Sequence, residues 1–283
     1  MFRRASRHDF DVCGPILRNG WLAGKTRGAL SVLAALGLLI CSPIWADVDE
    51  GLVLHAPFEG DCTDVSGNEH HGIVDGTPTY QAGPEGLAIG LPGGVYVDFG
   101  SSTDFQFGAG SFTIAFWVKA GVQDSAVLSK YRGETSWGQP GWNLQAENTP
   151  TFLDGIRLDY YDDEGNGGEG PGAPLWTGPE ALDDTWRHVA FVMDRDGARG
   201  IAYLDGNEVH DYDATNLGSA DNSTELYLGW RGNWNTFNGL IDELRIYDRA
   251  LVPYEVQVLA GHPVIFADGF ESGGMGVWSS AVP

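Results

Sequence analysis

An alternation of apolar and other residues with a period of two is the feature that most constrains the fold of this chain. In the segment Phe112-Thr-Ile-Ala-Phe-Trp-Val-Lys119, every second residue from Phe112 to Val118 is large and apolar. In an extended strand these side chains share one face, and the residues between them point to the other face. The pattern therefore predicts a strand that buries one face in a core.

Similar short stretches recur between turn-forming residues, and no amphipathic helical pattern runs longer than about ten residues. We expect strands at residues 52–58, 95–99, 112–119, 156–161, 187–193, 201–204, 225–230 and 240–247. Asp205-Gly206 favours a tight hairpin turn between residues 201 and 210. One short helix is expected from Pro253 to Ala260, with Gly261 ending it. The regular spacing predicts an all-β, two-sheet antiparallel sandwich with one short C-terminal helix.

The N-terminal region has the pattern of a secretory signal peptide. Six basic residues precede an apolar run over residues 29–40, and residues 41–46 end on Ala46 before Asp47. An apolar run of about a dozen residues is too short to span a bilayer, which needs ~20. We expect cleavage after Ala46 and a protein that is secreted or held at the cell surface or in the periplasm. Lipid attachment at Cys41 is the alternative, although Ile40 stands where lipoprotein signals carry a small residue.

Charge limits the partners of the exported chain. Removal of residues 1–46, which hold six basic and two acidic side chains, leaves 37 acidic against 10 basic groups and a formal net charge of −27. This balance argues against nucleic acid and anionic lipid and favours cations or neutral ligands. Only Cys62 remains of the three cysteines, so no intramolecular disulfide is available. A structural calcium ion is the expected source of additional stability, because carboxylate oxygens are abundant.

Five segments, in this order, resemble the LamG-like (laminin G-like, concanavalin A-like) jelly-roll family of lectin-like sandwiches. They are Leu52-Val-Leu-His-Ala-Pro-Phe-Glu-Gly60 with Asp64-Val-Ser-Gly-Asn68 and His71-Gly72, then residues 112–119, Trp186-Arg-His-Val-Ala190, Tyr203-Leu-Asp-Gly206 and residues 237–251. The resemblance implies one jelly-roll domain over residues 47–260, followed by a tail over 261–283. It does not fix a function, because such sandwiches serve as sugar binders, adhesion modules and enzymes.

The resemblance also implies a calcium site near the junction of the first and last strands. Asp64, Asn68 and Asp242 match its oxygen donors. As an alternative, Asp64 and Asn68 hydrogen-bond their own turn, as such side chains readily do. The acidic segment 159–169 is a second conceivable cation site, but it matches no calcium-loop spacing, and we interpret it as a solvated loop.

Tryptophans in or beside the expected loops are the candidate ligand contacts. They are Trp137, Trp142, Trp176, Trp230 and Trp234. An indole face matches the apolar face of a sugar ring, and nearby amide side chains can bond to hydroxyls. The alternative is that these rings are buried beneath the loops. The leading hypothesis is therefore a non-catalytic, lectin-like module that binds carbohydrate or a glycoconjugate. A structural or adhesion module that recognises protein is the second hypothesis.

A glycoside hydrolase is the third hypothesis. Residues 59–64 (Glu-Gly-Asp-Cys-Thr-Asp) approach the Glu-x-Asp-x-x-Glu motif of some sugar-cleaving relatives, with Asp64 replacing the final Glu. Glu59 and Asp64 are an odd number of positions apart, so a regular strand would point them to opposite faces. We assign no catalytic residue and expect no enzymatic activity.

The signal pattern makes a direct prediction about the exported chain. We expect its N-terminus to be Asp47, and intact-mass measurement of the exported protein checks this. A mass that starts at Met1 would contradict export by cleavage, and a lipid-modified chain that starts at Cys41 would favour the lipoprotein alternative.

Overall fold

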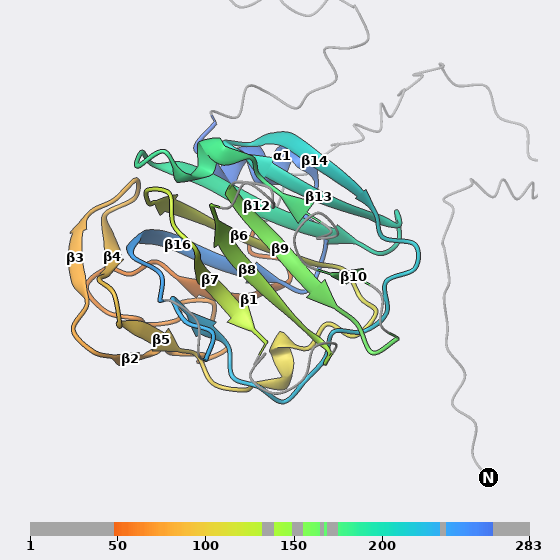
Figure 1. Ribbon diagram of the computed structural model, residues 1–283, viewed down its shortest axis with the longest axis horizontal. Helices are drawn as coiled ribbons and strands as arrows, with labels where there is room; N and C mark the ends of the chain where they lie inside the picture. The colour runs from red at the N-terminus through yellow and green to blue at the C-terminus, as the bar shows by residue number, and fades with distance from the viewer. Residues whose placement is uncertain are drawn as a thin grey trace, which may run out of the picture. The chain divides into compact units, whose positions relative to one another are not determined.

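A computed structural model describes residues 48–131, 139–148, 155–164, 167–168, 175–232 and 236–262 (Figure 1). These residues form two eight-stranded sheets whose named strands all pair antiparallel, as the sequence predicted. No helix among them is long and apolar enough to cross a membrane.

Sheet A has the strand order β14-β13-β12-β6-β16-β4-β3, with β1 also paired to β16. Its strands are β1 (Leu52–Ala56), β3 (Thr79–Ala82), β4 (Leu87–Leu91), β6 (Phe112–Lys119), β12 (Arg187–Asp194), β13 (Arg199–Leu204), β14 (Asn207–Asp213) and β16 (Gly239–Tyr247). The predicted hairpin is the connection between β13 and β14. There Asp205 (φ 48°) and Gly206 (φ 74°) both adopt the left-handed conformation that a two-residue turn requires.

Sheet B has the order β10-β9-β8-β7-β15-β5-β2, with β11 beside β9. Its strands are β2 (Ile73–Asp75), β5 (Tyr96–Asp98), β7 (Ser125–Lys130), β8 (Gly141–Glu147), β9 (Gly155–Tyr161), β10 (Gly167–Gly168), β11 (Leu175–Trp176) and β15 (Tyr227–Leu228). Two short 3-10 helices, η1 (Thr103–Phe105) and η3 (Pro179–Leu182), lie in connections. The sequence did not predict β2, β3, β4, β7, β8, β10 or β11 as strands, and the hairpin expected up to residue 210 extends to Asp213 in β14.

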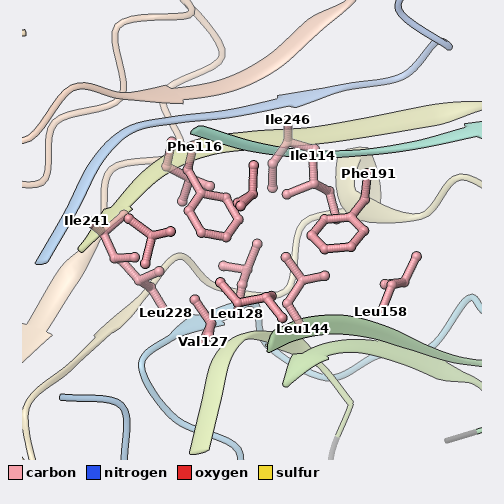
Figure 2. Close-up of a cluster of buried hydrophobic side chains, with 14 of the residues drawn as sticks. Ile114, Phe116, Val127, Leu128, Leu144, Leu158, Phe191, Leu228, Ile241 and Ile246 are labelled. Atoms are coloured by element: carbon pink, nitrogen blue, oxygen red, sulfur yellow. The ribbon is translucent and has the colours of Figure 1, made fainter. Parts of the chain in front are cut away.

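The hydrophobic core lies between the two sheets (Figure 2). Sheet A contributes apolar side chains that include Ile114, Phe116, Phe191, Ile241 and Ile246, and sheet B contributes Val127, Leu128, Leu144, Leu158 and Leu228. Each of these side chains is at most 1 % exposed. Burial of one such side chain stabilises the fold by roughly 1.5–3 kcal/mol, so the facing sheets hold each other in place.

The outer face of sheet A is covered in part by the only α-helix of the described residues, α1 (Pro253–Leu259). Its Val256 and Leu259 belong to a second buried cluster with Tyr203 of β13 and Tyr247 of β16. Pro253 stands at the start of the helix and Gly261 follows its end with a φ of 73°, as the sequence predicted.

A β-bulge interrupts β16 where it runs beside β6. Asp242 pairs with Trp117 and Arg245 pairs with Ala115, so β16 holds one more residue than β6 between these two pairs. Glu243 takes a left-handed φ of 53° at this point and accepts hydrogen bonds from His55 Nε2, at 2.7 Å, and from the Arg245 guanidinium.

His188 of β12 is a buried histidine that contacts the edge of the Trp117 ring, with ring centroids 5.3 Å apart. Burial lowers the pKa of His188 to about 3, and the positive charges of Arg245 and His262 act in the same direction. The folded chain therefore holds a neutral imidazole at pH 5, whereas the unfolded chain takes up a proton below its ordinary pKa of 6.5.

Acidification should consequently destabilise the fold through His188. Between pH 7 and pH 5 we expect this residue to lower the free energy of unfolding by on the order of 2 kcal/mol. Urea unfolding of the wild type and of His188→Gln at both pH values measures the effect, and the variant should lose this part of the pH dependence. His71→Gln, at an exposed histidine, is the control. An unchanged pH dependence in His188→Gln would contradict the prediction.

Candidate functional site

The strand register of sheet B aligns a row of side chains on its outer face, away from the core. The paired residues across β2, β5, β15, β7, β8 and β9 are Ile73, Asp98, Tyr227, Ser129, Asn143 and Asp159. Their chain neighbours Val97, Leu128, Leu144 and Leu158 belong to the core, and alternation along a strand places the row on the opposite side. The outer face of sheet B is therefore polar and aromatic.

Three aromatic side chains form a cluster where β5 meets β15. Tyr96 stacks on Trp230 with ring centroids 4.8 Å apart, and Tyr227 lies edge-on to both rings at 5.8 and 4.9 Å. All three are half-buried and so retain some accessible ring surface. We call Tyr96, Tyr227 and Trp230 the aromatic surface.

Two carboxylates flank the aromatic surface. The Tyr96 hydroxyl donates to Asp75 Oδ2 at 3.1 Å, and Asp98 is the β-sheet partner of Tyr227. Desolvation of the hydroxyl, the bond to Asp75 and the charges of Asp75 and Asp98 together raise the pKa of Tyr96. The field around this hydroxyl is therefore negative.

At the β8–β9 end of the same face lies a buried polar network. It consists of Asn143, Gln145, Glu147, Arg157 and Asp159, each less than 5 % exposed. The Arg157 guanidinium donates to Glu147 Oε2 at 2.6 Å and to Asp159 Oδ1 at 2.7 Å. Breaking such a pair from one side would leave an uncompensated buried charge, so the network holds β8 and β9 in one register.

Burial and nearby positive charges act in opposite directions on the pKa of Asp159 in the buried polar network. Burial raises the pKa of Asp159 to about 6, although the guanidiniums of Arg157 and Arg231 and a hydrogen bond from Asn143 act in the opposite direction. Asn143 Oδ1 finds no hydrogen-bond partner within the described ranges. These groups are closed to solvent, whereas the aromatic surface on the same face is partly exposed.

The interpretation of residues 159–169 as a solvated loop is wrong at its beginning. Asp159 belongs to β9 and Asp162 is 1 % exposed, with its Oδ2 accepting from the Gly218 amide at 2.6 Å. Asp159 lies within the strand that the sequence predicted over residues 156–161, and Asp162 directly follows β9, where it is buried against the Gly218 amide. Residues 165, 166 and 169 lie outside the described residues.

The five candidate tryptophans fall into different environments. Trp142 belongs to β8 and is 2 % exposed in the core, stacked on Phe112 with centroids 6.5 Å apart, so its expected role in a ligand-binding loop is wrong. Trp176 is half-buried on β11 beside His210. Trp230 belongs to the aromatic surface. Trp137 and Trp234 lie outside the described residues.

Asp64 and Asn68, two of the three candidate calcium ligands, are engaged in their own turn. The Asp64 carboxylate accepts four hydrogen bonds, all at 2.9 Å, from the amides of His55, Ser66 and His70 and from the Ser66 hydroxyl. The Asn68 side-chain amide donates to the carbonyls of Leu52 and Val53. This arrangement agrees with the alternative interpretation, in which both side chains fix the turn against β1.

Asp242 differs from these two residues. It is fully buried, and its Oδ2 accepts from the Glu85 amide in the β3–β4 connection, whereas Oδ1 has no partner among the described groups. Burial raises the pKa of Asp242 to about 7, and the nearby charges of Glu243 and Glu59 add to this. An unpartnered carboxylate oxygen beside a second carboxylate fits a hard cation. However, no group of three or more His, Cys, Asp or Glu in the described chain has metal-binding geometry.

The segment with the near-glycosidase motif is not a strand. Residues 57–64 follow β1 as an irregular connection, in which Glu59 is exposed and its Oε1 accepts from the Leu87 amide at 3.0 Å. Asp64 is 4 % exposed and fixed in its turn. The structure therefore gives these two carboxylates separate structural partners.

A sequence model of the concanavalin A-like lectin/glucanases superfamily, Laminin_G_3, matches residues 92–257, which is more than half of the chain. No curated protein sequence matches the chain.

Solved structures with the same fold include domain 4 of AbnA, a GH43 extracellular arabinanase from Geobacillus stearothermophilus, in complex with arabinotriose. That structure has 24 % identity and a TM-score of 0.56, with 74 % of this chain and 98 % of that chain covered. The binding domain of Paraclostridial Mosquitocidal Protein 1 has 17 % identity and a TM-score of 0.58, with 75 % and 52 % covered.

The binding domain of Botulinum Neurotoxin DC, in complex with SialylT, has 14 % identity and a TM-score of 0.54, with 76 % of this chain and 52 % of that chain covered. This chain thus spans about half the length of the two toxin domains. At identities this low the similarity describes the fold alone.

Proposed function

This chain belongs to the concanavalin A-like lectin/glucanases superfamily, and from that membership we propose that it is an exported, non-catalytic module that binds carbohydrate or a glycoconjugate. The observation that carries the proposal is the aromatic surface on the outer face of sheet B.

The chemistry of the aromatic surface suits a sugar. The partly exposed rings of Tyr96, Tyr227 and Trp230 offer apolar area to the C–H face of a pyranose or furanose. Asp75 and Asp98 supply acceptors for sugar hydroxyls at its edge. Mutual packing of the three rings limits their rotamers, so little conformational entropy remains to be lost on binding.

The ligands in two structures of similar fold support the proposal of carbohydrate binding. The arabinanase domain was solved with arabinotriose and the neurotoxin domain with SialylT. The arabinanase is extracellular, which is in keeping with the signal-peptide pattern over residues 1–46 of this chain.

The proposal predicts a glycan-binding protein whose affinity depends on Trp230. A glycan array of the exported chain, with calcium present, identifies a ligand, and calorimetry measures its affinity. Trp230→Ala should weaken binding at least about tenfold, equivalent to about 1.4 kcal/mol, because the stacking face is lost. Trp176→Ala, at another half-buried indole, is the matched control and should bind normally.

Two outcomes would contradict this assignment. A blank array with an intact fold, checked by circular dichroism, would favour the second hypothesis of an adhesion module that recognises protein. Release of reducing sugar from a polysaccharide would favour a glycoside hydrolase instead.

We also propose that calcium stabilises the domain through Asp242, with Glu59 as its neighbour. A bound divalent cation would neutralise the buried carboxylate and give its unpartnered oxygen a ligand. Asp64 would then contribute by shaping the adjoining turn, because its carboxylate already accepts four hydrogen bonds, and Asn68 would do so through the bonds from its Nδ2 to β1.

Calcium should therefore raise the melting temperature of the wild type, since it binds only the folded state. In chelator, the raised pKa of Asp242 means that its contribution to stability is lost as the pH rises from about 4 through about 7. Asp242→Asn should abolish the response to calcium, and Asp213→Asn, on the exposed edge strand β14, should retain it. Equal melting temperatures of the wild type in calcium and in chelator would contradict the proposal.

A further inference from the structure

Most basic side chains of the described residues have partners other than the aromatic surface, and Lys119 lies in the other sheet. Five arginines form ion pairs with carboxylates, namely Arg157, Arg187, Arg199, Arg245 and Arg249. Lys130 and Arg195 donate to backbone carbonyls, and Lys119 lies on β6 in sheet A. None of these contacts places a positive charge beside the rings of Tyr96, Tyr227 and Trp230.

Arg231 is the decisive case, because it directly follows Trp230 in the sequence. Its side chain is 5 % exposed, and its guanidinium carbon lies 5.6 Å from the centroid of the Tyr131 ring. Its charge acts on Asp159 of the buried polar network. The cation nearest to Trp230 along the chain is therefore turned into the sheet face and away from solvent.

From this distribution of charge we infer that the aromatic surface selects uncharged sugar units and rejects glycans with carboxylate or sulfate groups. The inference rests on the proposed carbohydrate binding and specifies its ligand class. An anionic group on a stacked sugar would lie beside Asp75 and Asp98, and no arginine or lysine within the described ranges is directed there to balance its charge. A hydroxyl at the same place can donate a hydrogen bond to either carboxylate instead.

Matched glycan pairs test this inference. Each pair has one sugar backbone in an uncharged and an anionic form, for example methyl-esterified and free oligogalacturonate, or an unmodified and a sulfated oligosaccharide. We expect the uncharged member to bind about two- to tenfold more tightly at 20 mM salt. At 0.5 M salt the difference should shrink, because screening shortens the reach of surface charges.

Asp75→Asn and Asp98→Asn each remove one charge and keep a side-chain oxygen that can accept a hydrogen bond. Either variant should raise the affinity for the anionic member severalfold and should weaken that for the uncharged member, whose hydroxyl loses a charged acceptor, so that the ratio of the two affinities falls. Asp213→Asn removes the same charge from β14 in the other sheet and should change neither affinity.

The outcomes distinguish the failure of charge selection from the failure of carbohydrate binding itself. Equal binding of both members at low salt, or unchanged discrimination in both Asp→Asn variants, would overturn the charge selection and leave carbohydrate binding intact. Absence of binding to every glycan would overturn both.

Discussion

Burial of the two inner sheet faces against each other is the interaction on which the rest of this structure depends. Each strand that takes part gives about every second side chain to the core, so within the sheets only the outward-pointing side chains can contact a ligand. Sheet A is partly covered by α1, whose Val256 and Leu259 join the cluster around Tyr203 and Tyr247. The outer face of sheet B keeps a partly exposed aromatic surface, on which the proposed recognition depends.

The outer face of sheet B combines a buried polar network with a partly exposed aromatic surface. In β8 and β9 the outward positions hold Asn143, Gln145, Arg157 and Asp159, which are buried and bonded to one another. Desolvation offsets the attraction between ionic groups in such a place, so their net contribution to stability is small. A slip of one residue would exchange them with Leu144 and Leu158 in the core, and the cost of burying them there disfavours it.

Elements with a strong local pattern were predictable from sequence. The strand over residues 112–119 has the predicted bounds, because its alternation is uninterrupted, and the turn at Asp205-Gly206 follows from backbone geometry alone. Trp142 was misplaced because glycine and proline around it suggested a loop, whereas Gly141 begins β8. The aromatic surface was not predictable, since Tyr96 and Trp230 are distant in the chain and meet only through the two-residue strand β15.

The bulge in β16 explains why the core-facing positions of this strand follow one alternation before Glu243 and the opposite alternation after it. Before it, the core residue is the odd-numbered Ile241, and after it the core residues are the even-numbered Leu244 and Ile246. The extra residue at Glu243 thus moves the inward-pointing positions of β16 from odd to even residue numbers. A relative that lacked this single residue would have to exchange apolar and polar residues along half of the strand, so insertions and deletions here should be far rarer than substitutions.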